Sequence, residues 1–174
     1  MKQFAIAVSL VAFLAVGSFG QNAPLPSTNV VTNFSAVALP GNQETLAATI
    51  ADIGFTPTPN SNLFLETIQS PSAPNLYGFY GAGISYQINE LSKLINNISP
   101  NLSGYKFRFT LIGSGGEVRV GDRNHVGGTA RFRTEYALTS GGGYNLAFEV
   151  GAARLPGVSP KWGKLFSVGQ AIHF

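Results

Sequence analysis

The side chains of this sequence that could do acid–base chemistry or hold a metal are few and scattered. Only two histidines occur, His125 and His173, and there is no cysteine. Neither histidine has metal-ligand spacing or lies beside a Ser nucleophile motif. The segment Asp122-Arg123-Asn124-His125 would place an acid near a base, but a polar loop accounts for it better than a catalytic pair. The sequence therefore predicts no catalytic residue, no metal site and no enzymatic activity.

The glycine-rich segment Gly113-Ser-Gly-Gly116 is the candidate for a phosphate-binding loop. It lacks the Lys and Ser or Thr that complete such a loop, and its glycines suit a turn equally well. We therefore expect no cofactor. The net charge of +3 reflects a small excess of Lys and Arg over few acids, so it does not indicate a nucleic-acid partner.

The first 20 residues have the order of an export signal. Lys2 is followed by an apolar run from Phe4 to Val16 and then by small residues, which makes cleavage after Gly20 or Gly17 our expectation. A retained membrane anchor is the weaker alternative, because the run falls short of about 20 residues and no basic cluster follows it. We expect a signal peptide over residues 1–20, a linker over 21–28 and one domain over 29–174.

Charged residues are scarce for a chain of 174 residues. They make up 11% of the sequence, against about 25% in an ordinary soluble domain. A protein that faces lipid over most of its outer surface has little use for exposed charge. Because no apolar stretch after the leader is long enough for a spanning helix, a closed β-barrel is the membrane-compatible solution.

Alternating apolar and polar residues predict strands along most of the chain. Tyr80, Ala82, Ile84 and Tyr86, for example, alternate with small or polar residues, as they do in a strand with one apolar face. The same period of two recurs toward the C-terminus. We expect about eight antiparallel strands, which include segments near residues 29–39, 45–53, 63–68, 80–88, 105–111, 130–138, 144–150 and 165–174.

Two segments interrupt this pattern. Leu91, Leu94, Ile95 and Ile98 have helical spacing, which predicts one short amphipathic helix with Asn89 as a cap. We interpret the helix as a packed connection between strands, with an interfacial or partner-binding role as the alternative. Between residues 111 and 118 the apolar positions change from odd to even numbers, which predicts a hairpin turn or a β-bulge.

The C-terminus carries the most specific pattern. The chain ends on Phe174, and counting back by two gives Ile172, Gln170, Val168 and Phe166. This resembles the last strand of small outer-membrane β-barrel proteins of the opacity or adhesin-like, eight-stranded type, although Gln170 replaces the usual apolar residue. The resemblance implies an outer-membrane location with lipid and the barrel-insertion machinery as partners. It also implies that Phe166, Val168, Ile172 and Phe174 form an assembly signal.

The fold class that we predict is all-β, an antiparallel up-and-down transmembrane barrel with one short helix. If its apolar rows face lipid, most strand charges point into the lumen and must pair with each other or stay wet. The expected lumen network consists of Lys106, Arg108, Arg131, Arg133, Glu135 and Glu149. About eight strands leave an interior that side chains fill, which favours a structural, envelope or surface-interaction role over a wide pore. A secreted, soluble β-sandwich that acts as a binding module is the alternative.

Overall fold

The computed structural model describes residues 28–38, 45–58, 60–70, 77–98, 107–139, 143–156 and 162–174. The signal peptide and most of the linker that the sequence predicts therefore lie outside the described residues, as do Lys106 and residues 140–142. The elements are β1 (Thr28–Ala38), β2 (Thr45–Thr58), β3 (Ser61–Ser70), β4 (Tyr77–Gln87), α2 (Asn89–Ile98), β5 (Phe107–Val120), β6 (Arg123–Ala137), β7 (Tyr144–Arg154) and β8 (Trp162–His173).

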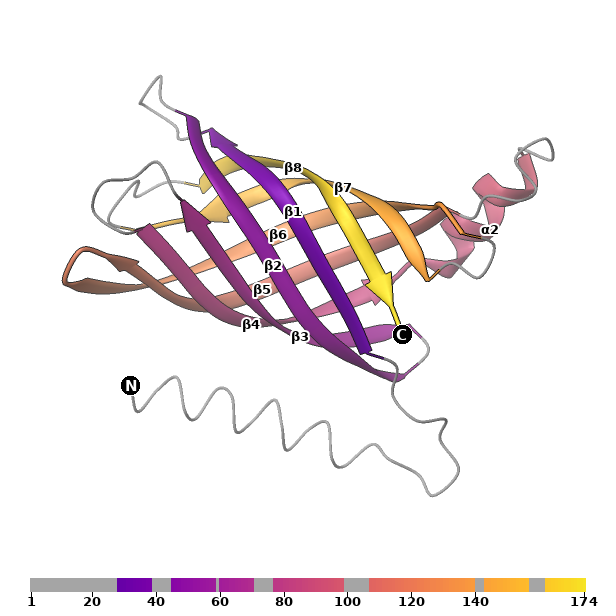
Figure 1. Ribbon diagram of the computed structural model, residues 1–174, viewed down its shortest axis with the longest axis horizontal. Coiled ribbons are helices and arrows are strands. Elements are labelled where there is room, and N and C mark those ends of the chain that lie inside the picture. Colours follow the sequence, from indigo (N-terminus) through magenta and orange to yellow (C-terminus); the bar gives the residue numbers. More distant parts are fainter. Residues whose placement is uncertain are drawn as a thin grey trace.

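The eight strands form one closed antiparallel barrel in which each strand pairs with its neighbours in sequence and β1 pairs with β8 (Figure 1). The strand number and the up-and-down order confirm the prediction from the sequence. A two-sheet sandwich, the alternative fold, is wrong because the strands close into a single sheet. Closure leaves no free sheet edge, so the backbone groups of every strand find partners within the barrel.

The two ends of the barrel differ. The terminal end carries the start of β1, the end of β8, helix α2 and the turns between β2 and β3 and between β6 and β7 (Figure 1). The far end carries the remaining connections, which include the tight turn between β5 and β6. In this turn Gly121 has a φ of 57°, a conformation that glycine adopts without steric cost.

Strand β5 runs without interruption through the segment where the sequence predicted a turn or a bulge. Its pairing with β4 and with β6 keeps one register from end to end, so this prediction is wrong. The apolar positions change parity because Leu111 faces outward near the terminal end, whereas Val118 points into an apolar part of the lumen near the far end. The irregular register instead lies between β2 and β3, at Phe55 and Thr58.

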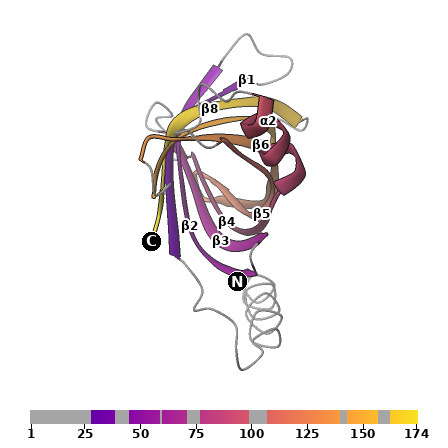
Figure 2. The same cartoon turned by 90° about the vertical axis from the view of Figure 1, so that its right-hand side faces the viewer.

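Helix α2 confirms the short helix that the spacing of its apolar residues predicted. The Ser92 amide donates to the Ile88 carbonyl, so Ile88 occupies the capping position expected for Asn89. Asn89 uses its side-chain amide to donate to Asn60 in the β2–β3 turn. Figure 2, which looks at the terminal end, shows α2 lying beside the rim of the barrel near β5 and β6. Among the described residues, no helix is long and apolar enough to cross a membrane.

Alternating side chains divide into an outer apolar face and an inner lumen. Outward residues such as Phe34, Leu65 and Ile84 are 76%, 60% and 61% exposed. Inward residues in the middle of the barrel are buried whether they are apolar or charged, because the lumen is narrow enough for side chains from opposite walls to meet. Glycines help to fit them: a Cβ atom at Gly83 would collide with the buried ring of Phe64.

Candidate functional site

The centre of the lumen holds a cluster of buried ionic side chains, built around Arg131 and Arg133 of β6. Alternation along the strand points both guanidinium groups inward. Arg131 contacts carboxylates on two sides: its Nη1 lies 3.0 Å from Glu149 Oε2 and its Nη2 lies 2.9 Å from Glu66 Oε1. Because both guanidinium groups are almost completely enclosed, these ion pairs are shielded from the solvent that weakens surface pairs.

Glu149 of β7 bridges the two arginines. It stands directly opposite Arg133 in the β6–β7 register, and Arg133 Nε lies 2.6 Å from Glu149 Oε1. The second oxygen of Glu149 accepts from Arg131 and from the Ser167 hydroxyl, the latter at 2.8 Å. Both carboxylate oxygens therefore have donors, which a buried charge requires if its burial is not to be strongly unfavourable.

Asp52 of β2 and Glu66 of β3 complete the cluster from the opposite wall of the barrel. The two acids face each other in the β2–β3 register, an arrangement that would be destabilising by itself. Arg131 neutralises it by contacting both acids, and Arg133 forms a second ion pair with Asp52. Three carboxylates thus surround two guanidinium groups in what we call the central ion network, formed by Asp52, Glu66, Arg131, Arg133 and Glu149.

A second group of ionic side chains lies next to this network, toward the terminal end. Glu135 accepts a hydrogen bond from Asn145 at 2.9 Å, and its Oε2 lies 2.8 Å from His173 Nε2. Arg108 Nη1 lies 2.8 Å from the same histidine nitrogen and 3.6 Å from Glu135. A ring nitrogen of a neutral histidine either donates or accepts a hydrogen bond. Protonated Nε2 of His173 would donate to Glu135, whereas unprotonated Nε2 would accept from Arg108.

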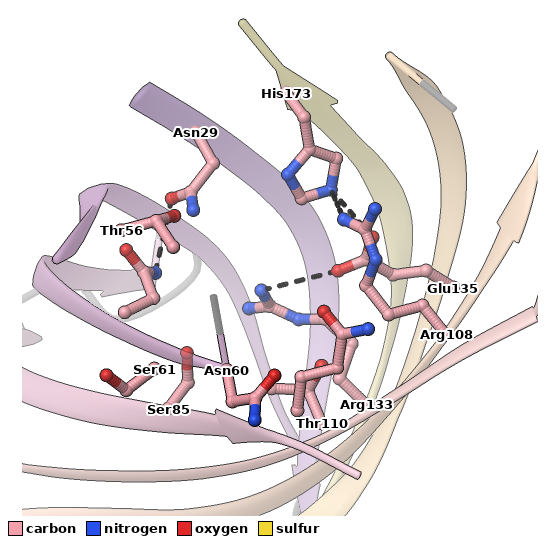
Figure 3. A pocket seen from close by; sticks show the side chains of 12 residues that line it. Asn29, Thr56, Asn60, Ser61, Ser85, Arg108, Thr110, Arg133, Glu135 and His173 are labelled. Atoms are coloured by element: carbon pink, nitrogen blue, oxygen red, sulfur yellow. Dashed lines mark hydrogen bonds and ion pairs between the residues drawn. The ribbon is translucent and has the colours of Figure 1, made fainter. Parts of the chain in front are cut away.

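A pocket of about 180 Å³ opens at the terminal end above these residues (Figure 3). Arg108, Glu135 and His173 form one wall, and Arg133 reaches into it from the central ion network. The rest of the lining consists of amides and hydroxyls, among them Asn29, Thr56, Asn60, Ser61, Ser85 and Thr110. This lining suits water or a small polar molecule, since nearly every wall can donate or accept hydrogen bonds.

Beyond the central ion network the lumen becomes apolar. Ile50 and Ile68 face each other in the register, one inward position toward the far end from Asp52 and Glu66. Both side chains are fully buried. They belong to a packed layer, which we call the apolar plug, formed by Ala48, Ile50, Ile68, Phe79, Val118, Ala153, Leu155 and Leu165. From the terminal end toward the far end, the lumen therefore contains first the polar pocket, then the central ion network and then the apolar plug.

The structure brings together four of the six lumen residues that the sequence predicted. Arg131, Arg133, Glu135 and Glu149 are all buried in the lumen, and Arg133 Nη1 lies 4.0 Å from Glu135 Oε1. Arg108 lies at the pocket with a side chain that is 34% exposed. Lys106 lies outside the described residues.

Sequence reasoning missed Asp52 and Glu66, and it assigned no role to His173. Each missed acid is a lone charge inside a short apolar segment, Ile50-Ala-Asp-Ile and Phe64-Leu-Glu-Thr. In a strand with an apolar outer face such a charge points inward, so each was a signal for a lumen residue. The other two candidates for chemistry are separate from this site: Asp122 is exposed in the β5–β6 turn, and Gly113 to Gly116 lie within β5.

The C-terminal row lies on the outer face of β8. Phe166, Val168 and Phe174 are 53%, 46% and 74% exposed, and Ile172 follows the same alternation. Gln170 shares this face, where its side-chain oxygen accepts a hydrogen bond from the Tyr144 hydroxyl at 2.7 Å. This bond partly satisfies the polar group that departs from the apolar row.

No protein-family model matches the chain, and no curated protein matches it in sequence. Solved structures do resemble it. Neisserial surface protein A (NspA) aligns over 86% of this chain and 97% of its own, with a TM-score of 0.54 and 13% identity. The N-terminal β-barrel domain of Pseudomonas aeruginosa OprF aligns over 85% and 97%, with a TM-score of 0.49 and 11% identity. The attachment invasion locus protein Ail of Yersinia pestis aligns over 86% and 97%, with a TM-score of 0.43 and 10% identity.

At such low identity the likeness to NspA concerns the fold. It covers nearly the whole of both chains and agrees with the closed, eight-stranded topology described above. With its outward apolar rows and its charged lumen, the chain has the fold of the small outer-membrane β-barrel proteins.

Proposed function

We propose that this protein is a non-enzymatic outer-membrane β-barrel with a structural, envelope or surface-interaction role, and that its lumen is filled rather than open as a wide pore. One observation carries the proposal. Apolar side chains cover the outside of the barrel while Arg131, Arg133 and Glu149 are buried inside, which is the reverse of the arrangement in a soluble protein. A bilayer stabilises that arrangement, whereas water would leave a large apolar surface exposed.

Aromatic side chains support the membrane location. Outward Tyr86, Tyr144 and Phe174 lie near the terminal end, and Trp162 lies at the first position of β8 near the far end, where it is 52% exposed. Aromatic residues at both ends of an apolar band are typical of barrels that span a bilayer, because amphipathic rings favour the interface with water.

The filling of the lumen supports a role without a wide pore. The central ion network spans the lumen from β2 and β3 to β6 and β7, and the apolar plug packs beside it. A barrel of eight strands has little space left once such side chains are in place. The function therefore rests on the outer surface, on the ends of the barrel, or on the stability that the barrel gives to the envelope.

Membrane fractionation tests the proposal. The mature chain should remain in the membrane pellet after carbonate extraction, separate with outer membranes on a density gradient, and migrate differently in detergent gels before and after boiling. Release from membranes as a soluble monomer, with no heat-dependent change in migration, would contradict the proposed location.

A further inference from the structure

We propose that helix α2 is an interfacial helix, with its apolar face inserted into the bilayer surface that surrounds the terminal end. The partner is thus lipid, at the boundary between headgroups and acyl chains. This inference rests on the membrane location proposed above. It assigns a function to a segment that could otherwise serve only as a connection between β4 and β5.

Helix α2 is held against the rim of the barrel by specific contacts. The Ser92 side chain is buried, accepts a hydrogen bond from the Phe109 amide of β5 at 3.4 Å and donates to the Ile88 carbonyl at 3.1 Å. Asn89 donates to Asn60 Oδ1 at 2.6 Å. These contacts fix the rotation of the helix about its axis, because they define which of its sides face the barrel.

The apolar side of α2 points away from the mouth of the lumen. Asn60 lines the polar pocket, so the bond from Asn89 marks the side of the helix that faces the mouth. With roughly 100° of rotation per residue, Ile98 lies about 180° from Asn89, and Leu94 lies about 140° from it. Both apolar side chains are uncovered by the barrel, since Leu94 is 55% exposed and Ile98 is 68% exposed.

Outward aromatic side chains of the barrel lie near the terminal end, where α2 is attached. Outward-facing Tyr86, which is 54% exposed, lies close before the helix in the chain. At the start of β5 the ring of Phe107 contacts that of Tyr136, with 5.1 Å between their centroids. Figure 1 shows that α2 runs obliquely outward from the terminal end, and Figure 2 shows that it lies at the side of the barrel mouth near β5 and β6.

The remaining side chains of α2 suit a helix that lies in the interface. Glu90, Lys93 and Asn97 are exposed and lie on the side of the helix opposite Leu91 and Ile95. Such a division into an apolar and a charged or polar face is typical of helices that lie on a membrane surface. A connection between two strands does not by itself require Leu94 and Ile98 to be uncovered, whereas lipid contact does.

Tryptophan fluorescence tests this inference in the full mature chain. Trp162 is the only tryptophan, so the substitution W162F gives a silent background for the variants L94W, I98W and K93W. In vesicles containing lipids brominated at shallow acyl positions, we expect L94W and I98W to show blue-shifted emission that bromine quenches. K93W, the matched control from the polar side, should emit as in water and be quenched by iodide.

A fourth variant separates this inference from the proposed function. Phe148 lies on the outer face in the middle of β7, so F148W should be quenched by lipids brominated at deep acyl positions. Absence of that quenching would overturn the membrane location and this inference with it. Quenching of F148W combined with iodide-accessible L94W and I98W would overturn this inference alone. Shielding of L94W from both iodide and brominated lipid would also overturn it, because protein would then cover the helix.

Discussion

Arg133 and Glu149 face each other across the β6–β7 pair, and the 2.6 Å contact between Arg133 Nε and Glu149 Oε1 lies inside the barrel, where both side chains are buried. Glu149 also accepts from Arg131 and Ser167. One carboxylate thus accepts hydrogen bonds from donors on β6 and β8 at once. We therefore expect the stability of the barrel to depend strongly on this side chain.

The substitution Glu149→Leu should destabilise the barrel more than Glu149→Gln. Leucine leaves two buried guanidinium groups without this acceptor, and breaking a buried ion pair in that way costs about 3–5 kcal/mol. Glutamine keeps one oxygen that can accept a hydrogen bond, so its effect should be smaller. Urea unfolding in detergent micelles, followed by Trp162 fluorescence, measures the difference. The control Glu90→Gln, on the exposed side of α2, should change stability by no more than about 0.5 kcal/mol. Equal, small effects of both Glu149 variants would show that this carboxylate is solvated.

Removal of Arg131 should be more harmful than removal of Glu66. The central ion network holds three carboxylates and two guanidinium groups, so negative charge is in excess. Glu66→Gln removes one of these negative charges. Arg131→Met instead leaves Asp52 and Glu66 facing each other with one arginine fewer. The double variant should recover part of the stability lost by Arg131→Met, and a double-mutant cycle in urea would measure the coupling. Strictly additive effects would mean that the two side chains do not interact.

Planar-bilayer recordings should show little steady conductance. The polar pocket at the terminal end is followed by the central ion network and then by the apolar plug, where Phe79 and Leu165 are fully buried. An ion would have to displace charged pairs and then cross packed apolar side chains. Detergent-only additions to the same bilayers provide the control. Large, stable steps of the kind that porins give would contradict a filled lumen.

The last residue should matter for assembly beyond its contribution to burial. In addition to its outward ring, Phe174 donates its backbone amide to the Thr28 carbonyl at 2.8 Å. Deletion of Phe174 removes both features, whereas Phe174→Ala keeps the backbone bond. If the terminal ring is part of an assembly signal, both variants should reduce the heat-modifiable protein in outer membranes more than Phe148→Ala does.

Phe148→Ala is a suitable control because its ring has a comparable position on the outer face of β7. A ring of this size contributes about 1.5–3 kcal/mol when it is fully buried, which sets the scale for an ordinary packing effect. Normal assembly of both Phe174 variants, with Phe148→Ala impaired, would leave Phe174 as an ordinary outer residue. A defect on deletion without a defect in Phe174→Ala would assign the effect to the backbone bond.

The alternation of the sequence by itself determined the strands and which residues share a face. Strand geometry is local, because side chains at every second position point the same way. That Arg131, Arg133 and Glu135 share one face of the strand could therefore be predicted without knowledge of their partners. The scarcity of charge, and the lack of an apolar stretch after the predicted leader that could form a spanning helix, then favoured a closed barrel over other membrane folds. The eight strands of the structure agree with that reasoning.

Only the tertiary structure decided which charges meet and where the lumen changes character. Arg131 and Asp52 are 79 residues apart in sequence and make contact because the sheet closes on itself and sets opposite walls together. The same closure places His173 beside Glu135 and gathers Ile50, Phe79 and Leu165 into the apolar plug. Local alternation assigns a face to each residue, but contacts across the lumen depend on strand register and barrel diameter, which no short segment of sequence contains.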